Sequence, residues 1–222
     1  MIFNTDDIKQ GEFKKESYDG YNLPRITKIL SFIDSEGLVD WANAIGRKGI
    51  NNKSILKEAA NIGSLTHESI EKFLKTEEEP VDRFTAFESF KMWYNDVWVN
   101  NHVEILGQEE TLSCDLFMGT YDLLLKINGK IYLMDFKTSN HVSYKYCMQL
   151  AAYRYMLRLN KNMNVDGCII LQLNKTNPGY NEFFLNFDNP EHLSYINDCE
   201  EAFLMLAMLY HKMYWVKNNY PF

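Results

Sequence analysis

The sequence lacks a long apolar run, and it does not open with a recognisable targeting segment. No stretch of about 18 or more uncharged apolar residues occurs among the 222 residues, which argues against a membrane span. The first residues, MIFNTDDIKQ, are acidic and contain neither the apolar segment of a signal peptide nor an Arg-rich amphipathic pattern. We therefore expect a cytoplasmic protein that has no membrane partner.

The chain also has few cysteines and no excess of basic residues. The four cysteines show no CxxC or Cys/His pairing of the kind used by zinc and iron–sulfur sites, so we expect free thiols and no iron–sulfur cluster. The formal net charge is −7, whereas non-specific affinity for nucleic acid comes from basic residues that neutralise phosphates. Any nucleic-acid binding must therefore depend on a local basic strip and on metal ions.

The pattern of apolar residues predicts an α/β fold with a central mixed sheet flanked by helices. With 46% apolar residues, the chain can bury a sizeable core as one domain. Residues 1–20 read as a loosely held arm, and the apolar period then changes from helical to alternating after position 101. We expect helices over residues 24–33, 36–46, 54–75, 81–100, 142–159 and 189–217, and strands over 103–114, 165–173 and 182–187. This order places a helical region, residues 1–100, against a core of residues 101–222.

The stretch GTYDLLLKINGKIYLMDFKTSN, residues 119–140, predicts the hairpin around which the core is organised. An Asn-Gly pair between apolar runs is typical of a two-residue hairpin turn. If Ile127 pairs with Lys130 across that turn, Asp122 lies directly opposite Asp135. Two carboxylates would then share one face of a sheet.

Opposed like charges destabilise a sheet unless something neutralises them. A divalent cation between Asp122 and Asp135 would do so. Because side chains alternate along a strand, Lys137 lies on the same face as Asp135 and suggests chemistry on an anionic substrate. The alternative is that both acids are solvated residues on the outer face of the hairpin.

Other candidate residues lie on the elements around the hairpin. His67 is on a helix, where a structural histidine is the alternative, and Glu109 or Glu110 could bring a further carboxylate from the preceding strand. On the helix after the hairpin, a polar face repeats at four-residue spacing. It consists of Lys145, Gln149 and Tyr153, with Arg154 on the neighbouring face.

In this order the residues resemble the PD-(D/E)xK nuclease superfamily and, within it, the RecB-type and phage exonuclease branch. That family has a helical His, an acid on the first strand, a G-x-x-D strand, a D/E-x-K strand and a helix with Q-x-x-x-Y. The present sequence supplies GSLTHESIEKFL around His67, then Glu109, GTYD with Asp122, DFK with Asp135 and Lys137, and QLAAY with Gln149 and Tyr153. LPRITKIL and DWANAIG also resemble helices of phage members, so the similarity spans roughly residues 21–175.

Two departures from the family pattern are visible. Thr120 and Tyr121 precede Asp122 where the family name has a proline, although this branch usually dispenses with that proline. The cysteines that bind an iron–sulfur cluster in some relatives are missing, which disfavours a cluster-bearing helicase-nuclease subtype.

The resemblance implies a three-layer αβα core like that of restriction endonucleases and a site for Mg²⁺ or Mn²⁺. It implies as metal ligands His67, Asp122, Asp135 and the Phe136 carbonyl. It assigns the catalytic roles to Asp122, Asp135, Lys137 and Glu109, with Lys137 orienting or deprotonating the attacking water. Substrate contacts are expected from Gln149, Tyr153, Lys145, Arg154 and Arg25.

The function implied by the resemblance is a Mg²⁺-dependent DNA exonuclease of phage type. Its partners would be DNA, as single strands or duplex ends, and a protein of replication, recombination or repair; a phage-encoded protein would work in the bacterial cytoplasm. An endonuclease of the same fold, a DNA-binding module without cleavage, and a carboxylate-metal hydrolase of small phosphoesters are the alternatives. Polarity, strand preference and the choice between DNA and RNA stay open.

Overall fold

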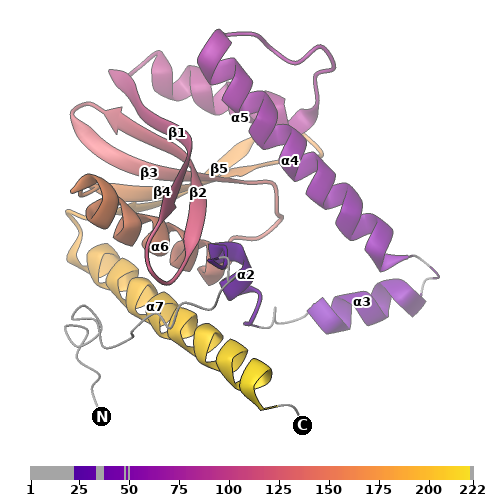
Figure 1. The fold of residues 1–222 in the computed structure, drawn as a ribbon. Helices are drawn as coiled ribbons and strands as arrows, with labels where there is room; N and C mark the ends of the chain where they lie inside the picture. The colour runs from indigo at the N-terminus through magenta and orange to yellow at the C-terminus, as the bar shows by residue number, and fades with distance from the viewer. Residues whose placement is uncertain (1–22, 34–37, 48, 50, 221–222) are drawn as a thin grey trace.

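The computed structural model describes residues 23–33, 38–47, 49 and 51–220 (Figure 1). The arm expected over residues 1–20 and the expected start of the second helix at 36–37 lie outside the described residues. The helices are α2 (Ile26–Leu30), α3 (Leu38–Arg47), α4 (Asn52–Thr76), α5 (Thr85–Trp98), α6 (Tyr144–Lys161) and α7 (Pro190–Asn219). The strands are β1 (Val103–Ser113), β2 (Met118–Ile127), β3 (Lys130–Lys137), β4 (Gly167–Leu173) and β5 (Tyr180–Asn186).

Most helix boundaries have local causes in the sequence. Asn51 caps α4, because its Oδ1 accepts a hydrogen bond from the Lys53 N–H at 3.0 Å. The same helix ends at Glu77, which adopts a left-handed conformation with φ 60 and lies three residues before Pro80. Asn189 caps α7, and Pro190 occupies the first turn, where its missing N–H costs nothing.

The five strands form one mixed sheet in the order β1-β2-β3-β4-β5. The hairpin prediction is confirmed: Ile127 pairs with Lys130, and the turn residues Asn128 and Gly129 have φ of 51 and 89. Strands β1, β2 and β3 are antiparallel, β3 and β4 run parallel through the crossover helix α6, and β5 returns antiparallel to β4.

Helices cover both faces of the sheet, which gives the three-layer α/β architecture expected from the sequence. On one face α2, α6 and α7 pack over apolar side chains of the strands, including Leu124, Leu133 and Ile170. On the other face α4 and α5 pack over Leu123, Leu125, Met134, Phe136 and Leu171. Figure 1 shows this layering, and it shows α3 and the first half of α4 standing away from the sheet.

The aromatic residues of α5 pack into the core. Phe87, Phe90 and Trp93 are fully buried, and the indole Nε1 of Trp93 donates a hydrogen bond to Glu182 on β5. All four cysteines are free. Among the described helices, none combines the length and the apolar character that crossing a bilayer requires.

Candidate active site

The candidate site lies where β2 and β3 separate. Their ladder pairing ends at Leu123 and Met134, so the expected direct pairing of Asp122 with Asp135 does not form. Instead, Oδ2 of Asp122 accepts a hydrogen bond from the Phe136 N–H at 2.7 Å. The Asp122 carboxylate thus accepts the hydrogen bond that a backbone carbonyl would accept in a regular ladder. This contact holds the carboxylate in a buried position between β2 and β3.

Strands β1 and β2 are irregular where they carry Glu109 and Asp122. Glu109 of β1 has φ 49, a left-handed conformation that is uncommon for a residue with a side chain. On β2 the period of two is interrupted at Asp122, because Tyr121 and Leu124 both belong to the core under α6. Such backbone irregularities are found preferentially at functional sites, where they re-aim a side chain.

His67 of α4 connects the acids to β3. Its Nδ1 lies 3.4 Å from Oδ1 of Asp122 and 3.8 Å from Oε1 of Glu109, and its Nε2 lies 3.2 Å from the Phe136 carbonyl. The ring therefore donates from Nε2 to a backbone carbonyl and directs Nδ1 toward two carboxylates. Metal-binding histidines commonly use their second nitrogen in this way.

Three of these side chains form a group that could hold a metal ion. One ligand atom each from His67, Glu109 and Asp122 lies within 4.8 Å of the others. Two carboxylates and one imidazole suit a hard or borderline divalent cation such as Mg²⁺ or Mn²⁺. The Phe136 carbonyl, which the resemblance implies as a further ligand, accepts a hydrogen bond from His67 here, and its role as a ligand stays a prediction.

Asp135 lies beside this group and is fully buried, at 1% exposure. Its Oδ2 forms an ion pair with the Lys137 ammonium, whereas its Oδ1 has no hydrogen-bond partner among the described residues. A buried carboxylate oxygen without a partner is costly, and it indicates a site built for a further cationic or donor group. The donor set therefore fits the metal that the resemblance implies.

The ionisation of the site follows from burial and from its close charges. Burial lowers the pKa of His67, but the Asp122 carboxylate outweighs it and raises that pKa to about 10. Burial raises the pKa of Asp135 to about 6, against the opposing effect of Lys137. Burial raises the pKa of Asp122, but the charges of His67 and Lys137, with the hydrogen bonds from His67 and the Phe136 N–H, together lower it below its ordinary value. Positive charge on His67 and Lys137 partly neutralises the three carboxylates of the site.

The motif residues of α6 are directed inward. Gln149 and Tyr153 are buried, and Nε2 of Gln149 donates to the Tyr153 hydroxyl at 3.3 Å. Burial raises the pKa of Tyr153, and the charges of Asp135, Asp122 and Glu109 raise it further, against the opposing effect of the hydrogen bond with Gln149. Gly119 allows this packing, since a Cβ there would lie 2.8 Å from Cε1 of Tyr153.

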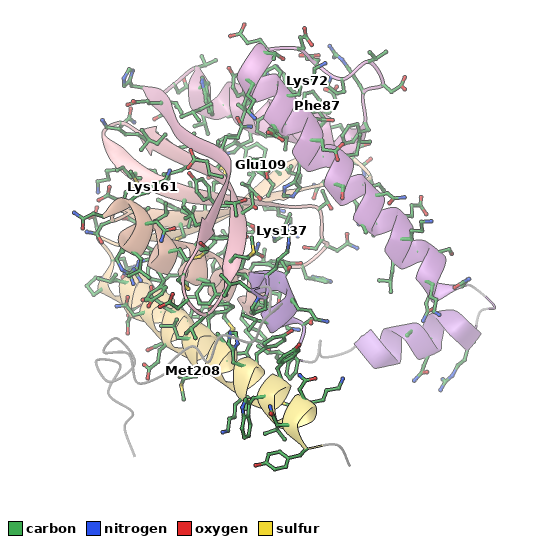
Figure 2. All side chains as sticks on the ribbon, in the orientation of Figure 1. Lys72, Phe87, Glu109, Lys137, Lys161 and Met208 are labelled. Atoms are coloured by element: carbon green, nitrogen blue, oxygen red, sulfur yellow. The ribbon has the colours of Figure 1, made fainter. Side chains whose placement is uncertain are left out.

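Glu110, the alternative to Glu109, lies away from the site. Its Oε2 accepts a hydrogen bond from the Tyr121 hydroxyl at 2.8 Å and forms an ion pair with Lys161 at the end of α6. These partners lower the pKa of Glu110. In Figure 2, Lys161 lies on α6, whereas Glu109 and Lys137 lie toward α4 and α2.

The expected substrate-binding cations are distributed over different surfaces. Arg25 is exposed at the start of α2, beside Met118 of β2. Lys145 donates from Nζ to the Ile33 carbonyl. Arg154 does not join the site: its Nη1 contacts Oδ1 of Asn197 at 2.9 Å and Oε2 of Glu200 at 3.2 Å on α7.

The sequence reasoning missed Tyr146. The Lys137 ammonium lies 4.9 Å from the centroid of its ring, so Tyr146 of α6 and Asp135 hold that ammonium from two sides. The sequence did contain a signal for Tyr146. Tyr146, Gln149 and Tyr153 follow the i, i+3, i+7 spacing of one helix face, just as Lys145, Gln149 and Tyr153 follow a four-residue spacing.

Comparisons with known proteins give structural neighbours only. No protein-family model and no curated protein matches the chain. A solved structure of the protein SSO0001 is similar with a TM-score of 0.39 and 12% identity, over 90% of this chain and 81% of that one. A phage-related exonuclease from Haemophilus somnus is similar with a TM-score of 0.33 and 10% identity, over 87% of this chain and 97% of that one. Both similarities are weak, so the functional argument rests on the site itself.

Proposed function

We propose that the protein is a metal-dependent nuclease that hydrolyses phosphodiester bonds in DNA, with exonuclease activity in replication, recombination or repair. The observation that carries the proposal is the convergence of His67, Glu109 and Asp122 beside the buried Asp135–Lys137 pair. Such a constellation places a cation site next to a fixed ammonium, as hydrolysis of an anionic ester requires. The exonuclease assignment and the phage-type cytoplasmic setting come from the family resemblance.

In this proposal His67, Glu109 and Asp122 hold Mg²⁺ or Mn²⁺, and Asp135 adds its negative charge beside them. A bound cation supplies Lewis-acid stabilisation of charge on the scissile phosphate and lowers the pKa of water. The Phe136 carbonyl fixes the ring of His67, and the Phe136 N–H fixes the carboxylate of Asp122. One residue of β3, Phe136, therefore orients two ligands.

Lys137 orients the attacking water and offsets the negative charge that develops on the phosphate. Its ammonium is held between Asp135 and the Tyr146 ring, and the nearby carboxylates outweigh burial and raise its pKa, so it stays protonated. A pre-oriented cation costs no reorganisation when the reaction occurs. Gln149 and Tyr153 lie on the adjoining face of α6, where they support Lys137 and the substrate backbone.

The proposal is tested by digestion of end-labelled DNA that is linear or circular, and single- or double-stranded. We expect release of nucleotides from linear DNA in Mg²⁺ or Mn²⁺ and none in chelator. Cleavage of closed circles would assign an endonuclease of the same fold. Binding without cleavage in either metal, together with hydrolysis of small phosphoesters only, would contradict the nuclease proposal.

A further inference from the structure

Helix α2 presents one cationic and aromatic face to solvent. Ile26, Ile29 and Leu30 are buried, whereas Thr27, Ser31 and three larger side chains stay exposed. The larger ones are Arg25 at the N-cap, Lys28 within the helix and Phe32 just after it, with Phe32 at 43% exposure. A large exposed aromatic side chain close in sequence to two exposed cations is more than core packing requires.

The same face continues onto α7. The rings of Phe32 and Tyr210 meet edge-on, with centroids 5.1 Å apart and planes at 69°. From Tyr210, Tyr214 and Lys217 follow at i+4 and i+7 on one side of α7. Tyr214 is 41% exposed and Lys217 is exposed. We refer to Arg25, Lys28, Phe32, Tyr210, Tyr214 and Lys217 as the α2–α7 stripe.

The stripe begins beside the candidate active site. A Cβ atom at Gly119, three residues before Asp122, would lie 2.7 Å from Cδ1 of Ile26 in α2. At the other end of α2, Nζ of Lys145 donates to the Ile33 carbonyl, next to Tyr146 and its contact with Lys137. Figure 1 shows α2 next to α7, with the C-terminal part of α7 continuing past it.

Charge is segregated in favour of an anionic ligand along this stripe. The chain has a net charge of −7, yet residues 23–33 and 202–220 contain no Asp or Glu. The same two segments contain Arg25, Lys28, Lys212 and Lys217. Asp115, an exposed acid, adjoins Leu116, whose carbonyl contacts His211 of α7, but the two segments themselves carry only cations on an acidic protein. This is the local arrangement that phosphate binding requires.

We propose that the α2–α7 stripe binds single-stranded nucleic acid and leads it to the active site. Arg25, Lys28 and Lys217 contact phosphates, while Phe32 and Tyr214 stack on bases. Stacking requires exposed base faces, which a single strand offers and a duplex hides. This inference rests on the proposed nuclease function, because it names a single strand as the form of nucleic acid that the nuclease site receives.

The test measures binding separately from cleavage. A fluorescein-labelled DNA single strand of about 15 nucleotides, within the usual site size for such surfaces, is titrated with the full chain in chelator, and the bound fraction is followed by anisotropy. We expect tighter binding than to a blunt duplex of the same sequence. Lys28→Ala/Lys217→Ala should lower the salt slope by about 1.4, since each single-strand phosphate contact contributes about 0.7.

Matched variants isolate the two chemical contributions. Lys72→Ala/Lys126→Ala removes two exposed lysines away from the stripe and should leave affinity and salt slope unchanged. Tyr214→Ala should weaken single-strand binding by about fivefold or more while leaving duplex binding unchanged, and Tyr214→Phe should restore it. Circular dichroism melting curves check that each variant is folded.

Several outcomes would overturn the proposal. Equal salt slopes for Lys28→Ala/Lys217→Ala and for Lys72→Ala/Lys126→Ala would do so. So would an equal loss of affinity for single strand and for duplex in Tyr214→Ala. A concentration-dependent dimer that the stripe variants abolish without changing DNA binding would make the surface a contact between copies. Sedimentation with anionic vesicles but no strand binding would make it a lipid surface. If wild type binds through the stripe but never cleaves DNA in metal, the stripe stands and the nuclease proposal fails.

Discussion

Glu109 and Glu110 are neighbours in the chain but contact helices on opposite faces of the sheet. Glu109 approaches His67 of α4, whereas Glu110 pairs with Lys161 of α6. The left-handed backbone at Glu109, with φ 49, accompanies this change of direction. The two residues therefore form a matched pair for testing the metal site.

Glu109→Gln should weaken Mn²⁺ binding by at least about tenfold, because a charged oxygen ligand becomes a neutral amide. Glu110→Gln removes the same charge one residue away and should leave Mn²⁺ affinity within about twofold. Isothermal titration of both variants with Mn²⁺ checks this, with DNA cleavage as a second readout. Equal losses of affinity in the two variants would show that the effect comes from net charge and not from ligation.

Lys137→Ala should lower the cleavage rate by about 10²–10³, the usual effect of removing one preorganised electrostatic donor. Its metal affinity should be kept, since the ammonium is not a ligand. The control is Lys72→Ala, an exposed lysine on α4 that pairs with Glu78. Single-turnover digestion of labelled DNA in saturating Mg²⁺ gives the rate; a Lys137→Ala rate within about tenfold of wild type would exclude the proposed role.

Local patterns in the sequence predicted the hairpin well, because an Asn-Gly turn and alternating apolar residues determine strand pairing without distant information. The three layers of the fold were implied by the family resemblance, whereas the order of helical and alternating segments predicted the helices and strands that form them. The pairing of Asp122 could not be predicted, since β2 stops pairing with β3 at Leu123 and Met134, while β3 continues beside β4 as far as Lys137. The choice between Glu109 and Glu110 depends on a left-handed residue, and the position of Arg154 depends on the distant Glu200.

Tyr146 positions Lys137, so its ring and not its hydroxyl should matter for the rate. Tyr146→Phe should keep kcat within about threefold, while Tyr146→Leu should lower it by about 2- to 30-fold, corresponding to about 0.5–2 kcal/mol for a cation–π contact. KM should change little in either variant. A parallel loss of kcat in both variants, or a change confined to KM, would assign Tyr146 to substrate binding instead.

Arg154 should contribute to stability and not to substrate affinity. Its guanidinium and the Glu200 carboxylate have only 14% and 15% side-chain exposure, and Arg158 shares the same carboxylate. Arg154→Ala should lower the free energy of unfolding by about 1–3 kcal/mol, as expected when a hydrogen-bonded charge loses its partner. Glu200→Ala should cost more, because it leaves two guanidinium groups without their carboxylate.

Urea denaturation of Arg154→Ala, Glu200→Ala and the double variant gives the coupling energy between the two residues. The salt dependence of single-strand binding, measured on the same proteins, separates this structural role from a binding role. Arg154→Ala should leave the salt slope unchanged, whereas Arg25→Ala should lower it by about 0.7. Arg25 is exposed beside the site, while Arg154 is directed into the contact between α6 and α7. A lower slope for Arg154→Ala with unchanged stability would reverse this assignment and extend the basic strip along α6.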